Sequence, residues 1–321
     1  MATKPVVWIT RTLSANTMKR ATQHYDVVFD DADEPADSHS IIARSAEVDA
    51  CIPCHSEHFS ADVVAQLNPR LKIVANHSVG VDHCDLDALK SRGIVVTNTP
   101  DVLSDATAEI AMLLLLGAAR RAAEGDAMVR SGAWTTWSPS FMVGHQVTGK
   151  RIGIVGMGKV GQVMARRARG FDMQVHYYNR QRLSAEKEAG AIYHDSLKSL
   201  LEVSEYLSLH CPATDETRGM LDAEAIARLP DSAIVVNTAR GALVDEQALV
   251  DAINRGKLAA AGLDCFVTEP GGNPQFAAHP NIFMLPHIGS ATFDTRDAMG
   301  YRALDNLDAF FAGKEPGDRL V

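Results

Sequence analysis

The sequence lacks the features that mark membrane, secreted and nucleic-acid-binding proteins. Its formal net charge is −9, whereas a general nucleic-acid or membrane-surface binder carries a basic excess. The chain does not open with the basic and then apolar pattern of a signal peptide. Its longest apolar stretch, residues 110–119, is too short to cross a bilayer. These absences predict a cytoplasmic protein with no nucleic-acid or membrane partner.

Cysteine is scarce, and its pattern excludes a disulfide framework. The sequence has five cysteines, an odd number, scattered along the chain. Cys51 and Cys54, followed by His55 and His58, invite a zinc or redox interpretation. A structural zinc site usually needs a second ligand pair further along, and none is evident. We therefore predict no bound metal and interpret this segment as a strand end running into a loop.

Low-complexity segments and solenoid-like repeats are also missing, so the chain has the profile of an ordinary globular protein. It contains 321 residues, of which 46% are hydrophobic and 22% charged. This length leaves room for two α/β domains.

Short apolar runs alternate with helical stretches, which predicts parallel sheets covered by helices on both faces. The first set of expected strands covers residues 6–10, 25–29, 48–52, 71–75 and 93–97, with helices at 61–67 and 86–91 between them. The second set covers 151–155, 173–178, 206–210, 233–237 and 260–264. We expect one long helix over 104–130, buried at its apolar centre, and a last helix over about 292–312.

A glycine-rich segment follows the first strand of the second set. Gly156-Met157-Gly158-Lys159-Val160-Gly161 comes directly after the apolar run 151–155 and opens a helical segment. This is the context that a dinucleotide-binding loop requires: glycines for the turn, for close backbone approach and for helix packing. The helix N-terminus would then face a pyrophosphate.

The next expected strand ends in a basic turn, Tyr178-Asn179-Arg180-Gln181-Arg182. An acidic residue there would bind an NAD ribose, but this chain has none. Guanidinium groups suit a 2′-phosphate, so we expect NADP(H) to be preferred, with NAD(H) possible. The alternative is that the two arginines only form a solvated turn.

Three further segments follow apolar runs: 237–241, ending in Arg240-Gly241; 262–270, with Asp264 and Glu269; and 286–292, with His287. Together with Ser78-Val-Gly-Val-Asp82, Asn98-Thr-Pro100 and Asp105-Ala-Thr-Ala-Glu109, they make the chain similar to the D-isomer-specific 2-hydroxyacid dehydrogenases from about Asn76 to Thr292. The resemblance implies two Rossmann-like, doubly wound parallel-sheet domains of the α/β class, with an interdomain cleft. Residues 1–102 plus 291–321 would form the substrate-binding (catalytic) domain, and residues 103–290 the dinucleotide-binding domain.

The resemblance also implies roles for three side chains, each of which makes chemical sense. His287 would give a proton to the keto oxygen as general acid. Glu269 would bind the other ring nitrogen and favour the imidazolium. Arg240 would bind the substrate carboxylate and polarise the keto group.

Further contacts are implied for both ligands. Ser78, Val79 and Gly80 would join Arg240 and His287 around the substrate, the backbone amides of Val79 and Gly80 binding its carboxylate. Asp264 would hold the nicotinamide carboxamide. The remaining candidates for cofactor contact are Thr107, Cys211, Pro212, Thr238, Ala239, Gly289 and Ser290.

Within the family, the chain most resembles the glyoxylate and hydroxypyruvate reductases, through Ser56-Glu-His58, Asp101-Val-Leu-Ser-Asp105 and Trp134-Thr-Thr-Trp137. The predicted reaction is NADPH-dependent reduction of a small 2-keto acid to the D-2-hydroxy acid, by a homodimer. Two alternatives stay open. One is a reductase of another polar 2-keto acid such as 2-ketogluconate, and the other is a non-enzymatic, corepressor-like nucleotide sensor.

Overall fold

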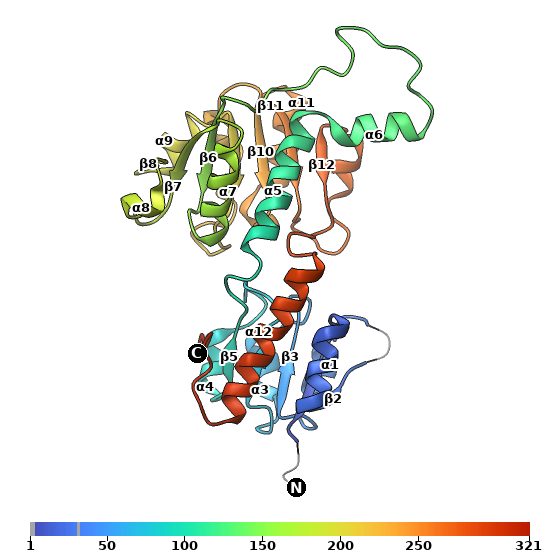
Figure 1. Ribbon diagram of the computed structural model, residues 1–321, viewed down its shortest axis with the longest axis vertical. Helices are drawn as coiled ribbons and strands as arrows, with labels where there is room; N and C mark the ends of the chain where they lie inside the picture. Colours follow the sequence, from blue (N-terminus) through green and yellow to red (C-terminus); the bar gives the residue numbers. More distant parts are fainter. Residues whose placement is uncertain (1–3, 31–32) are drawn as a thin grey trace. The chain divides into compact units, whose positions relative to one another are not determined.

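The computed structural model describes residues 4–30 and 33–321, and the chain divides into two compact units (Figure 1). Unit 1 comprises residues 1–103 and 291–321, and unit 2 comprises residues 104–290. Each unit is built on one sheet, of five strands in unit 1 and seven in unit 2, and neighbouring strands in both sheets are parallel. The predicted α/β class with parallel sheets is confirmed.

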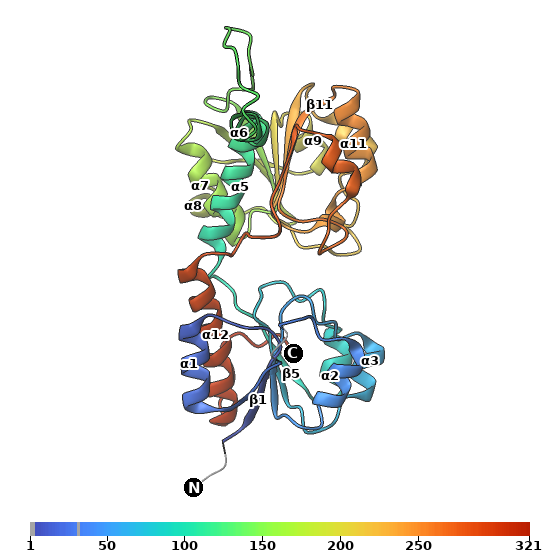
Figure 2. The ribbon, with the colours of Figure 1, turned by 90° about the vertical axis from the view of Figure 1, so that its right-hand side faces the viewer.

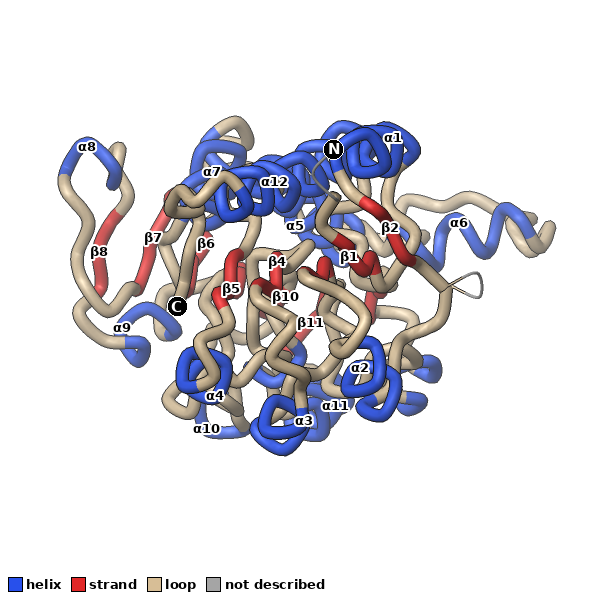
Figure 3. Tube along the Cα trace, turned by 90° about the horizontal axis from the view of Figure 1, so that it is seen from below, coloured by secondary structure: helices blue, strands red, loops and turns tan. Residues whose placement is uncertain are grey.

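Unit 1 is a sheet of order β2-β1-β3-β4-β5 between two layers of helices (Figures 2 and 3). Helices α1 and α12 cover one face, and α2, α3 and α4 cover the other. Since both faces are buried, the central strands are apolar throughout. The strands are β1 (Val6–Ile9), β2 (Asp26–Val28), β3 (Ala50–Ile52), β4 (Ile73–Ala75) and β5 (Val95–Thr97). The helices are α1 (Ala15–His24), α2 (Ser38–Arg44), α3 (Ala61–Gln66), α4 (Leu86–Ser91) and α12 (Phe293–Phe311).

Unit 2 is a sheet of order β12-β11-β10-β9-β6-β7-β8. Helices α5 and α7 lie on one face, and α9 and α11 on the other (Figure 2). The strands are β6 (Arg151–Val155), β7 (Gln174–Tyr178), β8 (Ile192–His194), β9 (Tyr206–Leu209), β10 (Ala233–Asn237), β11 (Leu258–Leu263) and β12 (Ile282–Met284). The helices are α5 (Ser104–Ala119), α6 (Ala122–Arg130), α7 (Lys159–Arg169), α8 (Ala185–Glu188), α9 (Leu197–Leu201), α10 (Ala223–Arg228) and α11 (Glu246–Asn254), with short 3₁₀ turns at Gly241–Leu243 and Pro274–Ala278.

The order of strands in unit 2 reverses between β6 and β9, because β7 and β8 extend the sheet on one side and β9 to β12 extend it on the other. In open parallel sheets, ligands bind beyond the carboxyl ends of the strands at such a reversal. The glycine-rich segment follows β6 directly and therefore lies at this point.

The predicted continuous helix over 104–130 is wrong, because the chain forms two helices there. Arg121, between α5 and α6, has φ 57°, a left-handed conformation that ends the first helix. The carbonyl of Ala119 accepts a hydrogen bond from the amide of His145 (2.8 Å), which ties the end of α5 to a later segment. Helix α5 packs against the sheet, whereas α6 buries none of its residues. The apolar pattern therefore marks α5 alone.

Two other elements show where sequence patterns succeed and fail. The predicted last helix is confirmed as α12, and its N-cap is Thr292, whose side chain accepts from the amide of Thr295 (3.1 Å). Strand β8, a three-residue edge strand with one residue exposed and two half-buried, carries too weak a pattern and was not predicted. Among the described residues, no helix is both long enough and apolar enough to cross a membrane.

Candidate functional site

The glycine-rich segment forms a tight turn between β6 and α7. Gly156 has φ 91°, and a Cβ there would lie 2.6 Å from the amide nitrogen of Cys211. A Cβ at Gly161 would overlap the carbonyl oxygen of Gly156, so α7 can pack this closely only without a side chain. Gly158 caps α7 and leaves its first turn uncovered. This cradle, at the N-terminus of an eleven-residue helix, fits the pyrophosphate of a dinucleotide.

The ends of β9 and β10 lie beside this turn. His210, which follows β9, shares hydrogen bonds with the hydroxyls of Ser208 (2.8 Å) and Thr238 (3.5 Å). Burial lowers the pKa of His210 to about 4, so this imidazole is neutral at physiological pH. It ties two of the predicted cofactor-binding segments, 211–212 and 238–239, to one edge of the sheet. His210 was missed by the sequence analysis because an isolated histidine at a strand end carries no distinctive signal.

The basic turn after β7 contains two arginines in different surroundings. The Arg182 guanidinium is paired with Glu188 (2.8 Å) and lies over the ring of Tyr193, 5.6 Å from its centroid. Arg180 is exposed and forms no ion pair within the described part of the chain. The Asn179 side chain donates to the carbonyl of Gln181 (3.0 Å), which shapes the turn. Arg182 is thus already engaged, so the two predicted guanidinium groups are not equivalent.

The turn that carries Arg240 is held by Asn237, the last residue of β10. The Asn237 side chain donates to the carbonyl of Arg240 (2.8 Å) and accepts from the amide of Ala239 (3.0 Å). Gly241 lies against the backbone of Phe266, where any Cβ would overlap. The Arg240 turn therefore packs directly against the loop that leads to Glu269.

Glu269 and His287 meet in unit 2, as predicted. The Glu269 carboxylate is 2.5 Å from Nδ1 of His287 and accepts from the amide of Phe266 (2.7 Å). Both side chains are largely covered, with 21% and 31% exposed. His287 has φ 53°, an unfavourable backbone conformation for a histidine. Such strain is characteristic of functional positions, and here it accompanies the contact with the carboxylate.

A second carboxylate, that of Glu246 in the first turn of α11, fixes the loop around Glu269. It accepts from the amide of Val267 (2.9 Å) and from the side chain of Asn273 (3.0 Å), one residue near each end of the loop. Glu246 could not be recognised from the sequence, because an acidic residue at a helix N-terminus is common.

Asp264, Thr107 and Gly289 lie together. The buried Asp264 carboxylate accepts from the amide of Ile288 (2.8 Å), and a Cβ at Gly289 would lie 3.1 Å from Asp264 and 3.4 Å from Thr107. Burial raises the pKa of Asp264. Ser290 follows directly and is half-buried. These predicted cofactor-binding residues therefore form one cluster next to His287.

In unit 1, the segment 78–80 is folded so that its carbonyl groups are bound internally. The Ser78 hydroxyl donates to the carbonyl of Gly80 (2.7 Å), and the side chain of Asn98 donates to that of Val79 (2.9 Å). Within residues 4–30 and 33–321, the amides of Val79 and Gly80 donate to no backbone acceptor. Two adjacent donors of this kind can bind a carboxylate. Just before them, burial lowers the pKa of His77 to about 4.

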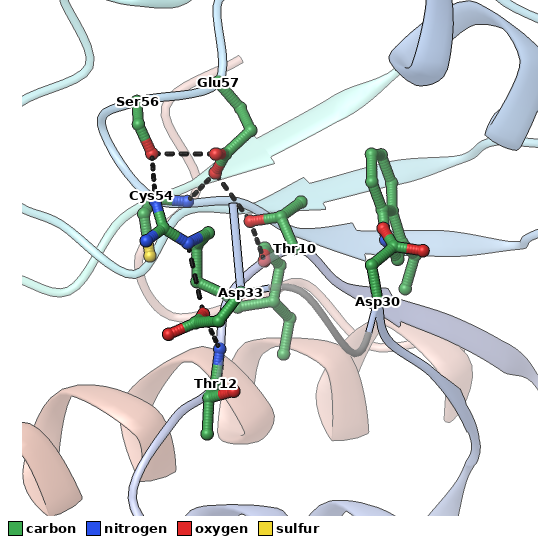
Figure 4. Close-up of polar contacts among 10 residues, drawn as sticks. Thr10, Thr12, Asp30, Asp33, Cys54, Ser56 and Glu57 are labelled. Atoms are coloured by element: carbon green, nitrogen blue, oxygen red, sulfur yellow. Dashed lines mark hydrogen bonds and ion pairs between the residues drawn. The ribbon is translucent and has the colours of Figure 1, made fainter. Parts of the chain in front are cut away.

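The loop 53–58 of unit 1 is organised around the buried carboxylate of Glu57 (Figure 4). Cys51 and Cys54 are free thiols on either side of the strand end. Burial raises the pKa of Cys54 to about 12, which disfavours a reactive thiolate. The hydrogen bonds here serve the loop's conformation.

Comparison with known proteins gives a consistent result. The model for the D-isomer specific 2-hydroxyacid dehydrogenase NAD binding domain matches residues 112–289. The chain is 44% identical over 314 residues to the glycerate dehydrogenase of Hyphomicrobium methylovorum, covering 97% of this chain and 98% of that protein. It is 42% identical over 318 residues to the glyoxylate reductase of Pyrococcus furiosus, covering 98% and 94%. The fold matches an NADPH-dependent glyoxylate/hydroxypyruvate reductase from Sinorhizobium meliloti, solved with NADP and malonate, with a TM-score of 0.88, 30% identity and coverage of 99% and 97%.

Proposed function

The chain belongs to the D-isomer-specific 2-hydroxyacid dehydrogenase family and is an enzyme of that family, and on this premise we propose that it reduces glyoxylate or hydroxypyruvate to the D-2-hydroxy acid with NADPH. The observation that carries the proposal is the contact between Glu269 and Nδ1 of His287, beside the turn of Arg240 and on the same sheet as the dinucleotide loop. An acid, its orienting carboxylate and a permanent cation are what reduction of a keto acid requires.

We assign hydride transfer to unit 2, which carries the seven-stranded sheet. A bound nicotinamide would supply the hydride, and the loop 156–161, with Asp264 and Thr107, fits its dinucleotide. His287 would donate a proton to the keto oxygen through Nε2, because Nδ1 faces Glu269. The Glu269 carboxylate orients the ring and stabilises its positive charge before the proton is given up.

Arg240 and the amides of Val79 and Gly80 would bind the substrate's anionic end. A guanidinium can hold a carboxylate through two parallel hydrogen bonds and withdraw electron density from the adjacent keto group. Unit 1 would on this view bind substrate (residues 1–103 and 291–321), and unit 2 the dinucleotide.

The preference for NADPH rests on Arg180. No acidic residue ends β7, and the exposed Arg180 is available to a 2′-phosphate while Arg182 is paired with Glu188. The Sinorhizobium enzyme, with NADP bound in its crystal structure, is consistent with this choice.

Steady-state kinetics test the proposal. The purified protein would be assayed with NADPH and NADH against glyoxylate, hydroxypyruvate, pyruvate and 2-ketogluconate, following loss of reduced cofactor. We expect kcat/KM to be highest for NADPH with glyoxylate or hydroxypyruvate. If no 2-keto acid oxidises either cofactor at any concentration, the proposed reaction is wrong and a nucleotide-sensing role is favoured.

We also propose that the enzyme is a cytoplasmic homodimer. Helix α6 buries no residue, and the segment after it exposes large apolar side chains, with Trp134 55% and Trp137 73% accessible. Such a patch is characteristic of an interface. Sedimentation equilibrium would measure the mass, and a monomer across the micromolar range would contradict the dimer.

A further inference from the structure

Polar side chains gather where the central strands of unit 1 end, and the proposed reaction does not account for them. Thr10 and Arg11 follow β1, and the loop 53–58 follows β3, its neighbour in the sheet. The amide of His77, after β4, donates to the carbonyl of Pro53 (2.9 Å). The loop 53–58 is thus joined to the segment that carries Val79 and Gly80, at the same edge of the sheet.

Glu57 is the centre of this arrangement, and its side chain is completely buried. One carboxylate oxygen accepts from the hydroxyl of Thr10 (2.6 Å) and the amide of Cys54 (2.8 Å), and the other accepts from the hydroxyl of Ser56 (2.7 Å) (Figure 4). A buried carboxylate with a donor at each of its oxygens holds the loop in one conformation. No donor in this set is an ionisable group.

The contact with Glu57 also fixes which way the Ser56 hydroxyl points. A carboxylate only accepts, so the hydrogen of Ser56 is directed at Glu57 and the lone pairs of Oγ face other donors. The donor beside it is Arg11, with Nη1 at 3.4 Å, a long hydrogen bond. Both side chains are partly exposed, so a small polar group can reach them.

The charge of Arg11 is balanced by Asp33. Nε of Arg11 is 3.2 Å from the Asp33 carboxylate, which also accepts from the amide of Thr12 (2.8 Å). That backbone hydrogen bond, with a smaller contribution from Arg11, lowers the pKa of Asp33. The pair presents a strong donor without net charge, which favours a neutral polar group over a second carboxylate.

We propose that Arg11 and Ser56 determine substrate specificity by recognising a hydroxyl on C3 of the 2-keto acid, and that Glu57 positions them. A C3 hydroxyl can accept from the guanidinium of Arg11 and donate to Oγ of Ser56 at the same time. A C3 methyl group, as in pyruvate, can do neither and would leave both groups without the contact. This inference rests on the proposed reduction and names hydroxypyruvate as the preferred substrate.

Kinetic selectivity tests this inference. Glyoxylate has no C3 and is the internal reference, so kcat/KM for hydroxypyruvate is divided by that for glyoxylate and by that for pyruvate. We expect Arg11→Met to lower both ratios about tenfold and Ser56→Ala about threefold, while glyoxylate reduction changes less than about twofold. Arg70→Met is the matched control, because Arg70 forms a similar ion pair with Asp49 (3.1 Å) in the same unit, and should leave both ratios unchanged.

Glu57→Gln tests the positioning role separately. The amide would direct a donor at Ser56 and reverse its hydroxyl, so selectivity for hydroxypyruvate should fall with little change in kcat for glyoxylate or in NADPH affinity. Arg11→Lys should recover part of the selectivity lost in Arg11→Met. Should both Arg11→Met and Ser56→Ala keep the wild-type ratios, or lower all three substrates equally, the specificity role is wrong while the proposed reaction stands. Wild-type protein that reduces no keto acid would instead overturn the proposed reaction.

Discussion

Each unit contains a carboxylate that organises a loop, but the two carboxylates have different partners. Glu269 in unit 2 contacts the imidazole of His287, a side chain of the type most often used for acid–base catalysis. Glu57 in unit 1 contacts two hydroxyls and a backbone amide. Glu269 is 21% exposed, whereas Glu57 is fully buried. Under the proposed mechanism, proton transfer and loop conformation therefore depend on separate carboxylates.

Of the changes that test this comparison, replacing the imidazole of His287 should have the largest effect on kcat. His287→Gln keeps the size and a hydrogen bond to Glu269 but removes the proton donor, so kcat should fall about 10³-fold. Stopped-flow measurement of cofactor oxidation checks this, with His145→Gln, an exposed histidine of the same unit, as the control. Activity within tenfold of wild type would exclude His287 as the general acid.

Replacing the carboxylate partner should have a smaller effect. Glu269→Gln removes the negative charge that faces Nδ1 of His287 and weakens the orientation of the ring, so we expect kcat for reduction to fall about 100-fold. Steady-state kinetics measure this, and Glu224→Gln is the control, since Glu224 pairs with Arg228 on the surface. A kcat equal to that of the wild type would contradict the role of Glu269.

The sequence predicted the contact between Glu269 and His287 but not what supports it. The family resemblance, carried by several motifs in the same order, pointed to His287 and Glu269, and the glycine turn was recognised from its place between an expected strand and an expected helix. The residues that hold them, Asn237 and Glu246, act through backbone amides and carbonyls of distant segments. Such hydrogen bonds leave no local pattern, and only the folded chain shows them.

The same limit applies to the helices and to the basic turn. The apolar run indicated helix α5 but could not locate its end, where Arg121 is left-handed and the carbonyl of Ala119 accepts from the distant amide of His145. Nothing in the sequence distinguished Arg180 from Arg182, and both were predicted to bind the 2′-phosphate. Glu188, six residues beyond Arg182, distinguishes them by pairing with one.

Removing the buried carboxylate should affect stability more than chemistry. In Glu57→Ala, the amide of Cys54 loses its acceptor and the hydroxyl of Thr10 keeps only the longer contact with the carbonyl of Ile52 (3.4 Å), so the free energy of unfolding should fall by about 2 kcal/mol. That is roughly a 30-fold change in the unfolding equilibrium. Urea denaturation measures it, with Glu269→Ala as the comparison, which we expect to lose less than half as much because Glu269 is partly exposed. Equal losses of unfolding free energy in the two variants would show that Glu57 is no more important for stability than Glu269.

The smallest expected effect concerns the cofactor. Arg180→Asp places a carboxylate where it can bind ribose hydroxyls and repel a 2′-phosphate, so the ratio of kcat/KM for NADPH to that for NADH should fall at least about tenfold. Arg182→Gln is the informative comparison, since its guanidinium is already paired with Glu188 and should shift the ratio less than about threefold. If the two variants shift the ratio equally, the ion pair with Glu188 does not make Arg182 less important for cofactor preference than Arg180. If neither shifts it, the basic turn is only a solvated surface, and the preference for NADPH has no basis in these side chains.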